Sequence, residues 1–243
     1  LEINMVKLFA DGADYDSIVE LSKNEKVVGF TTNPTLMREA GVENYEEFSK
    51  KVIKYLAENR PNTSLSLEVF ADEKEEMIHQ ARKIDSWGKE QDYDVYVKIP
   101  VQNTKGINNY DVIDSLNFEN VKLNVTAVFT TNQVVDVIER VVSETPMIIS
   151  VFAGRIADTG VNPEEIISES ILYRKLVKPR TPIEFLWASS REAYNYVQAE
   201  KSGCEIITMS PDLIKKVDKF GKDLDLFSIE TVQMFYGDAV KSG

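Results

Sequence analysis

One lysine stands inside a run of apolar residues, where a charged side chain is costly to bury. Lys98 lies in the segment YVKIP, flanked by Val97 and Ile99. If its side chain points into the protein, desolvation favours the neutral amine, which can attack a carbonyl carbon. The pattern therefore indicates a nucleophile that forms a Schiff base. A lysine that caps the run or pairs with a carboxylate fits the pattern as well, because ion pairs also bury lysines.

Two carboxylates occupy comparable places at the ends of other apolar runs. Asp11 follows the first run and Glu68 lies near the end of the third. A pair of carboxyl groups near a lysine could serve as general acid and base. With 40 acidic residues in the chain, a solvated loop carboxylate is the alternative for each of them.

Hydroxyl, amide and guanidinium groups follow most of the remaining runs. Asn33 precedes Pro34 and fits a helix N-cap as well as a ligand-binding group. Arg155, Ser189 and Arg191 suggest a phosphate site, because a guanidinium binds phosphate oxygens in a bidentate manner. Each arginine alone could equally be a surface ion-pair partner. The other polar residues of this kind are Thr31, Asn124, Thr126 and Ser150.

For these residues to form one site, the fold must bring the ends of the apolar runs together. Short apolar runs alternate with segments of helical period along the whole chain. We predict strands at Met5–Ala10, Val27–Thr31, Ser64–Phe70, Val95–Ile99, Val121–Val128, Met147–Phe152, Pro182–Ala188 and Glu205–Met209. We predict helices at Tyr15–Ser22, Pro34–Glu58 (interrupted at Gly41-Val42), Glu73–Trp87, Gly106–Leu116, Asn132–Val142, Pro163–Val177, Arg191–Lys201 and Asp212–Lys219.

Eight strands that each precede a helix predict a single α/β domain, the (β/α)8 TIM barrel, over residues 1–243. In such barrels the active site lies at the carboxyl ends of the strands, where the residues above are expected. The turn after the first run reads FADGAD, which lacks the glycine pattern of a dinucleotide-binding fold or a P-loop.

Composition excludes several classes of protein. A net charge of -12 argues against general binding of nucleic acid or of an anionic membrane, yet allows a small anionic substrate. The single cysteine, Cys204, excludes an internal disulfide and fits a reducing cytoplasm. The start Leu1–Lys7 lacks the pattern of a secretory signal, and no run is long enough for a membrane helix. The single histidine, His79, makes a His-rich metal site unexpected.

Several segments together resemble the transaldolase family in order and spacing, from about Lys7 to Leu213. They are LFAD, GFTTNPTL, LEVFA, YVKIP, LNVTAVFT, ISVFAGRIAD and WASSRE. The resemblance implies a class I aldolase on a (β/α)8 barrel, with the Schiff-base lysine on the fourth strand. The strand count places Lys98 on the fourth strand independently. No metal and no cofactor are implied, because the imine itself accepts the electrons.

The resemblance also implies roles for the residues named above. Lys98 would attack the keto carbon of a ketose phosphate of the fructose 6-phosphate type, and Asp11 would be the acid/base group. Glu68 with Thr126 would orient the water that forms and hydrolyses the imine. Asn33 and Asn124 would bind substrate hydroxyls, with Thr31 and Ser150 close by. Arg155, Ser189 and Arg191 would hold the phosphate.

Two positions distinguish branches of the family. Related fructose-6-phosphate aldolases release dihydroxyacetone, and they carry glutamine in place of Glu68 and tyrosine in place of Phe152. Both residues here favour a transaldolase, which passes the three-carbon unit to an aldose phosphate in pentose phosphate metabolism. The alternatives are the aldolase outcome and a barrel that binds phosphosugars without turnover. Trp187 replaces a small family residue, and Ser190 replaces a phenylalanine. Counted back from Ser189 by alternation, Trp187 is expected to point into the barrel, where its indole would narrow the cavity. A compensated change in the packing of the core is the alternative.

The segment after the eighth unit, 222–243, is predicted to be an extra C-terminal helix. It has more apolar residues than one helix face can hide, among them Leu226, Phe227, Ile229 and Phe235. One side is expected to pack on its own barrel and the other on a neighbouring subunit, which predicts a homo-oligomer. The resemblance points the same way. A lid over the barrel mouth is the alternative.

Overall fold

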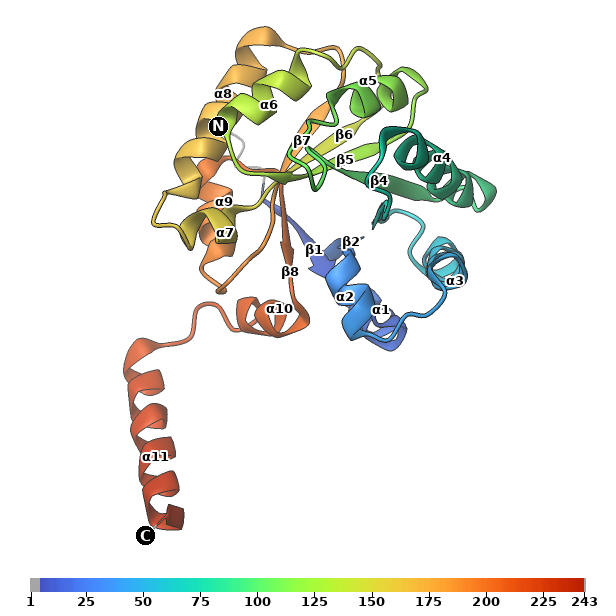
Figure 1. Cartoon of the computed structure of the whole chain (residues 1–243). Helices are drawn as coiled ribbons and strands as arrows, with labels where there is room; N and C mark the ends of the chain where they lie inside the picture. Colours follow the sequence, from blue (N-terminus) through green and yellow to red (C-terminus); the bar gives the residue numbers. More distant parts are fainter. Residues whose placement is uncertain (1–4, 243) are drawn as a thin grey trace.

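Eight parallel strands close into one barrel in chain order in the computed structural model, which describes residues 5–242 (Figure 1). Residues 1–4 and 243 of the predicted domain lie outside the described residues. The strands are β1 Lys7–Asp11, β2 Val27–Thr31, β3 Ser64–Glu68, β4 Asp94–Pro100, β5 Leu123–Val128, β6 Met147–Val151, β7 Ile183–Trp187 and β8 Ile206–Met209. The predicted TIM barrel is confirmed.

Helices connect successive strands around the barrel, and two more helices follow the last strand (Figure 1). They are α1 Tyr15–Ser22, α2 Pro34–Glu39, α3 Tyr45–Asn59, α4 Lys74–Glu90, α5 Tyr110–Phe118, α6 Thr131–Ile138, α7 Ala153–Ala157, α8 Pro163–Val177, α9 Asn195–Ser202, α10 Pro211–Val217 and α11 Leu224–Ser242. Side chains at the N-caps satisfy free backbone N–H groups, as when Asn44 accepts from Glu47 and Thr130 accepts from Gln133.

Helix boundaries differ from the prediction where side chains cap the backbone. The predicted helix Arg191–Lys201 begins at Asn195, because the Asn195 side chain accepts hydrogen bonds from the backbone N–H groups of Arg191 and Glu192. The short helix α7 was not predicted; its five residues lie between the predicted strand Met147–Phe152 and the predicted helix Pro163–Val177. The interruption after α2 falls at Gly41, whose φ of 69° suits glycine.

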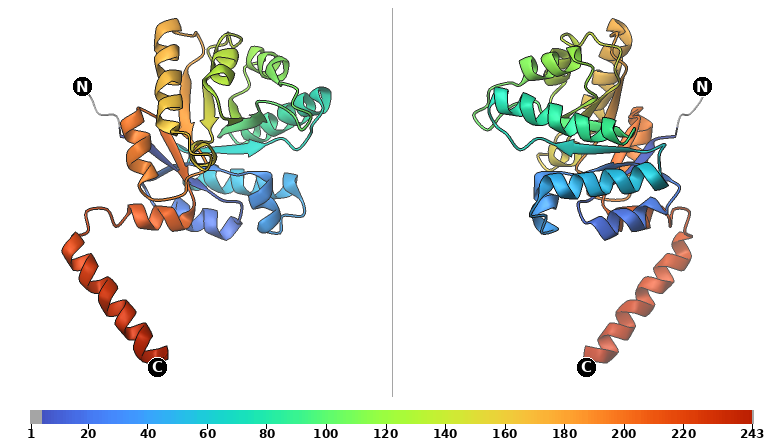
Figure 2. Two further views of the ribbon diagram at one scale, coloured as in Figure 1. Left: turned by 60° about the vertical axis from the view of Figure 1, so that its left-hand side comes forward. Right: turned by 90° about the vertical axis from the view of Figure 1, so that its right-hand side faces the viewer.

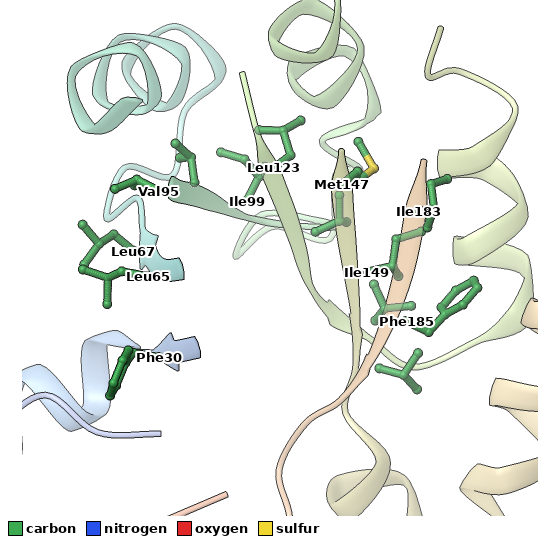
Figure 3. Packing of buried hydrophobic residues seen from close by; sticks show 14 of the residues in the cluster. Phe30, Leu65, Leu67, Val95, Ile99, Leu123, Met147, Ile149, Ile183 and Phe185 are labelled. Atoms are coloured by element: carbon green, nitrogen blue, oxygen red, sulfur yellow. The ribbon is translucent and has the colours of Figure 1, made fainter. Parts of the chain in front are cut away.

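The strands bury apolar side chains on both faces, as expected for a parallel barrel. The larger cluster lies between strands and helices and includes Phe30, Leu65, Leu123, Ile149 and Phe185 (Figure 3). The smaller one fills the barrel and consists of Phe9, Tyr96, Ile148, Leu186, Ala188 and Ile206, with Val28 and Phe152 against it.

Four inward rows change from apolar to polar towards the carboxyl ends of their strands. Two residues beyond Phe9, Tyr96, Ile148 and Ile206 stand Asp11, Lys98, Ser150 and Thr208, because alternate side chains of a strand share a face. The apolar interior therefore forms a floor on which a polar layer rests.

Helix α11 projects away from the barrel, as both views of Figure 2 show. None of its residues is buried, and its apolar side chains are at least half exposed, including Leu224, Phe227, Phe235 and Tyr236. The expectation that one side of this helix packs on its own barrel is wrong. The alternative, that the helix forms a lid over the barrel mouth, is wrong as well. The loop before α11 carries the helix outward, so it has no barrel surface within reach.

Between residues 5 and 242, no helix is long and apolar enough to cross a membrane. The lone cysteine, Cys204, is buried, and burial raises the pKa of its thiol.

Candidate active site at the carboxyl ends of the strands

A cavity of about 210 Å³ opens at the carboxyl ends of the strands. Most of the residues singled out in the sequence line it, and they come from strands far apart in the chain. These are Asp11, Thr31, Asn33, Lys98, Thr126, Ser150, Phe152, Arg155, Ser189 and Arg191. The lining also includes Leu186, Ala188, Ser190, Thr208 and Ser210. Glu68 and Asn124 lie next to this lining, as described below.

Lys98 lies inside the barrel on β4 and is only 6% exposed. Its Nζ donates to the backbone oxygen of Thr32 at 2.7 Å and lies 3.4 Å from Glu68 Oε2. Lys98 is therefore buried, as its apolar neighbours predicted, and it is also paired with a carboxylate. The Tyr45 hydroxyl donates to the Glu68 carbonyl at 2.8 Å and fixes the end of β3 beside the amine.

Asp11 faces the same cavity from the end of β1. Burial raises the pKa of its carboxyl above the ordinary value, while the charge of Lys98 and a hydrogen bond from Thr31 act in the opposite direction. The Thr31 hydroxyl donates to Asp11 Oδ1 at 2.8 Å. A buried carboxyl that faces the cavity in this way can exchange a proton with a bound molecule.

Asn124 lies in the polar layer, fully buried and beneath the cavity lining. Its Oδ1 accepts from the Ser150 hydroxyl at 2.6 Å, and its Nδ2 donates to Ser66 Oγ at 3.1 Å. Asn124 therefore fixes Ser150, which faces the cavity. Thr126 also faces the cavity, and its buried Oγ1 has no hydrogen-bond partner within residues 5–242. Such a group is available to a water or substrate atom.

Asn33 is the helix N-cap that the sequence suggested, and it also faces the cavity. Its side-chain oxygen accepts from Leu36 N–H at 3.0 Å as the N-cap of α2, and the residue also lines the cavity. Because the cap uses the oxygen, the side-chain amide N–H groups are the part of Asn33 suited to a ligand.

Two arginines form the outer rim of the cavity. Arg155 on α7 and Arg191 after β7 are exposed, and Arg191 pairs with Asp158 at 2.7 Å. The two loops touch at Gly154, where an added Cβ would lie 1.6 Å from the Ser189 carbonyl oxygen. Since only glycine allows this approach, Gly154 is what brings Arg155 next to Ser189 and Arg191.

The expectation for Trp187 is wrong. Trp187 is 1% exposed and belongs to the cluster between strands and helices, whereas Leu186 and Ala188 face the barrel interior and line the cavity. Ser189 has a left-handed φ of 62°, so the chain turns there. Alternation counted back from Ser189 is therefore wrong by one residue, and the indole does not narrow the cavity.

The sequence reasoning missed several residues of the cavity. Thr208 ends the inward row of β8, and Ser190 donates through its hydroxyl to the Thr208 carbonyl at 2.8 Å. Thr32 takes part through its backbone oxygen alone, which no residue type reveals. Thr208 could have been found, because it is a polar residue within the apolar run IITM.

Comparisons with known proteins identify the family of the chain. The family model described as transaldolase/fructose-6-phosphate aldolase matches residues 8–241. A protein of Brucella melitensis named "Probable transaldolase" is 30% identical over 98% of both chains. Another from Dehalococcoides mccartyi with the same name is 29% identical, covering 84% of this chain and 86% of the relative.

A solved structure supports the fold alone. The chain of a Burkholderia cenocepacia protein superimposes with a TM-score of 0.53 at 12% identity, covering 87% of this chain and 78% of that one. The sequence match over residues 8–241 is much more specific, and it spans every strand that contributes to the cavity except the first residue of β1. On this ground the chain belongs to the transaldolase/fructose-6-phosphate aldolase family.

Proposed function

We propose that the protein is a transaldolase that works through a Schiff base on Lys98. The observation that carries the proposal is the buried amine of Lys98, which lies 3.4 Å from one carboxylate, Glu68, and shares a cavity with another, Asp11. Binding alone needs no imine-forming amine, so this arrangement disfavours a barrel that only holds phosphosugars. The arginine rim fits a phosphorylated substrate.

The proposed reaction begins at the keto carbon of a ketose phosphate such as fructose 6-phosphate. Lys98 Nζ adds to this carbon, and loss of water gives the imine. Asp11 then takes the proton of the C4 hydroxyl while the C3–C4 bond breaks and its electron pair moves into the imine, which becomes an enamine. The shortened aldose phosphate leaves with its new carbonyl.

The second half runs the same steps in reverse with another aldose phosphate. The enamine carbon attacks the acceptor's carbonyl carbon, the C–C bond forms, and Asp11 returns its proton to the new hydroxyl. Water then hydrolyses the imine. We assign the orientation of this water to Glu68, beside Lys98, and to the unpartnered hydroxyl of Thr126.

The remaining polar groups would bind the substrate. Asn33 and Ser150, with Asn124 behind Ser150, are placed to contact hydroxyls of the three-carbon unit. Arg155, Ser189 and Arg191 would hold the phosphate about one side of the cavity.

Product analysis with and without an aldose phosphate acceptor tests the proposed transfer. We expect a new ketose phosphate to form in the presence of the acceptor, with little free dihydroxyacetone in its absence. Rapid release of dihydroxyacetone without an acceptor would contradict the proposed transaldolase and would favour an aldolase instead.

The side chain of Phe152 is expected to control the fate of the enamine. Phe152 lines the cavity and packs on Phe129, with ring centroids 5.8 Å apart, and has no hydroxyl to deliver a proton or hold a water. We expect Phe152→Tyr to increase the share of free dihydroxyacetone among the products, measured as the ratio of release to transfer. Phe129→Tyr is the matched control, since Phe129 does not line this cavity. An unchanged ratio in Phe152→Tyr would show that another residue controls the fate of the enamine.

We also propose that the protein is a homo-oligomer assembled through α11. A helix with exposed apolar residues on all sides, standing clear of its own barrel, needs another surface to cover it. Truncation after Gly221 is expected to lower the order of the oligomer in sedimentation velocity at micromolar concentration, while the barrel remains folded by circular dichroism. A full-length protein that sediments as a monomer would contradict the proposal.

A further inference from the structure

A chain of two hydrogen bonds runs from Thr208 on β8 through Thr31 on β2 to the carboxyl of Asp11 on β1. Thr208 lies on β8, which pairs with β1, and is 5% exposed. Its Oγ1 lies 2.5 Å from Thr31 Oγ1, and the Thr31 hydroxyl in turn reaches Asp11 Oδ1 at 2.8 Å. Three neighbouring strands, β8, β1 and β2, thus contribute one member each.

The number of protons fixes the direction of this chain. An ionised carboxylate can only accept, so Thr31 must donate its single proton to Asp11, and Thr208 must then donate to Thr31. A protonated Asp11 can donate to Thr31 Oγ1 instead. Thr31 then turns its proton to Thr208, and the Thr208 hydroxyl turns its own towards the cavity that it lines.

We propose that Thr208 is a positioning residue for Asp11. Together with Thr31 it forms a relay of two hydroxyls that provides the carboxyl with a hydrogen-bond partner in both protonation states. Without the Thr208 hydroxyl, reversal of the Thr31 hydroxyl would lose its fixed acceptor at 2.5 Å, and its proton would depend on whatever occupies the cavity, which is costly.

This inference rests on the proposed function, in which Asp11 gains and loses a proton within each turnover. The relay concerns only the steps that break and make the C–C bond. Imine formation, which uses the Lys98 amine, does not require it. Loss of the Thr208 hydroxyl should therefore slow the making and breaking of the C–C bond without slowing imine formation.

The backbone holds Thr208 in place independently of its hydroxyl. β8 pairs in register with β1, with Thr208 opposite Phe9, and the Ser190 hydroxyl donates to the Thr208 carbonyl at 2.8 Å. A variant that changes only the hydroxyl is therefore expected to keep the strand where it is.

Two pairs of variants isolate the hydroxyl. Threonine and valine have nearly the same shape, and alanine is serine without its hydroxyl, so the wild type is compared with Thr208→Val and Thr208→Ser with Thr208→Ala. We expect the variants without the hydroxyl to lose about tenfold in kcat for cleavage of fructose 6-phosphate, a part of the usual contribution of acid–base catalysis, with KM little changed. Thr208→Ser should retain most of the activity.

Imine formation distinguishes the relay from a purely structural role, because a structural defect would lower imine formation and C–C cleavage together. Borohydride trapping of the sugar on Lys98 is expected to proceed at the wild-type rate in all four proteins, while C–C cleavage falls in two of them. Thr181→Val, which removes a buried hydroxyl bonded to the Ser143 carbonyl at the other end of the barrel, is the control and should leave both rates unchanged.

A double-mutant cycle completes the test. If the two hydroxyls act as one relay, Thr208→Val should cost nothing further in a Thr31→Val background. Additive losses, or equal losses in trapping and cleavage, would overturn the relay. A wild-type protein that forms no trapped adduct would instead refute the proposed function, so the two failures are distinguishable. If Thr208→Val is too unstable to assay, the serine and alanine pair decides the question.

Discussion

Lys98→Ala is expected to lose the covalent sugar adduct completely and to lower kcat by about 10^4-fold or more, the order expected when a nucleophile is removed. Incubation of the wild type with fructose 6-phosphate and borohydride should add the mass of the reduced sugar to the peptide that contains Lys98. The reason is geometric, since Lys98 is the buried lysine whose amine reaches the cavity.

The control for this experiment is a lysine of the same sheet that lies away from the cavity. Lys122 precedes β5, pairs with Asp94 and is part of the protein surface, so Lys122→Ala should keep both adduct and activity. Thermal unfolding is measured alongside, because Lys98→Ala leaves Glu68 and Asp11 without their cation. Labelling that persists in Lys98→Ala would show that another residue forms the imine.

Arg191→Ala is expected to weaken transition-state binding of phosphorylated substrates by about 2 kcal/mol or more, about 30-fold in kcat/KM. Activity on the corresponding unphosphorylated sugar should change little. Without ligand, Arg191 pairs with Asp158 at 2.7 Å, so a phosphate would have to replace this half-exposed pair. Exposed pairs are weak, and the replacement is therefore expected to cost little.

The matched control is Arg180, whose exposed pair with Glu144 lies away from the cavity. Arg180→Ala should leave the kinetic parameters of both substrates unchanged. Equal losses on the phosphorylated and unphosphorylated sugars in Arg191→Ala would indicate that the arginine acts through the structure of the loop after β7.

The placement of Lys98 could be predicted from the sequence because two independent features of the sequence agree there. The alternation of runs along the chain gives the strand number, and the apolar neighbours Val97 and Ile99 indicate burial. The same logic placed Asp11 and Ser150 in the cavity lining, since both continue an inward row of their strands.

The failures arise where the backbone leaves the regular strand or where atoms far apart in the chain meet. The left-handed Ser189 breaks the alternation, so Trp187 was assigned to the wrong face. The hydrogen bond between Thr31 and Thr208 joins residues 177 positions apart, and no local pattern indicates it. The outward course of α11 depends on a loop whose composition allowed either direction.

The contact between Gly154 and the Ser189 carbonyl limits how this protein could be redesigned for other substrates. No side chain fits at position 154 while the loop after β7 keeps its course, so a library that varies the rim must leave this residue fixed. Leu186 on β7 and Ala188 directly after it offer the freer choice, because both face the cavity and no side-chain hydrogen bond depends on them. Changes in acceptor size are best sought at these two positions of the cavity lining.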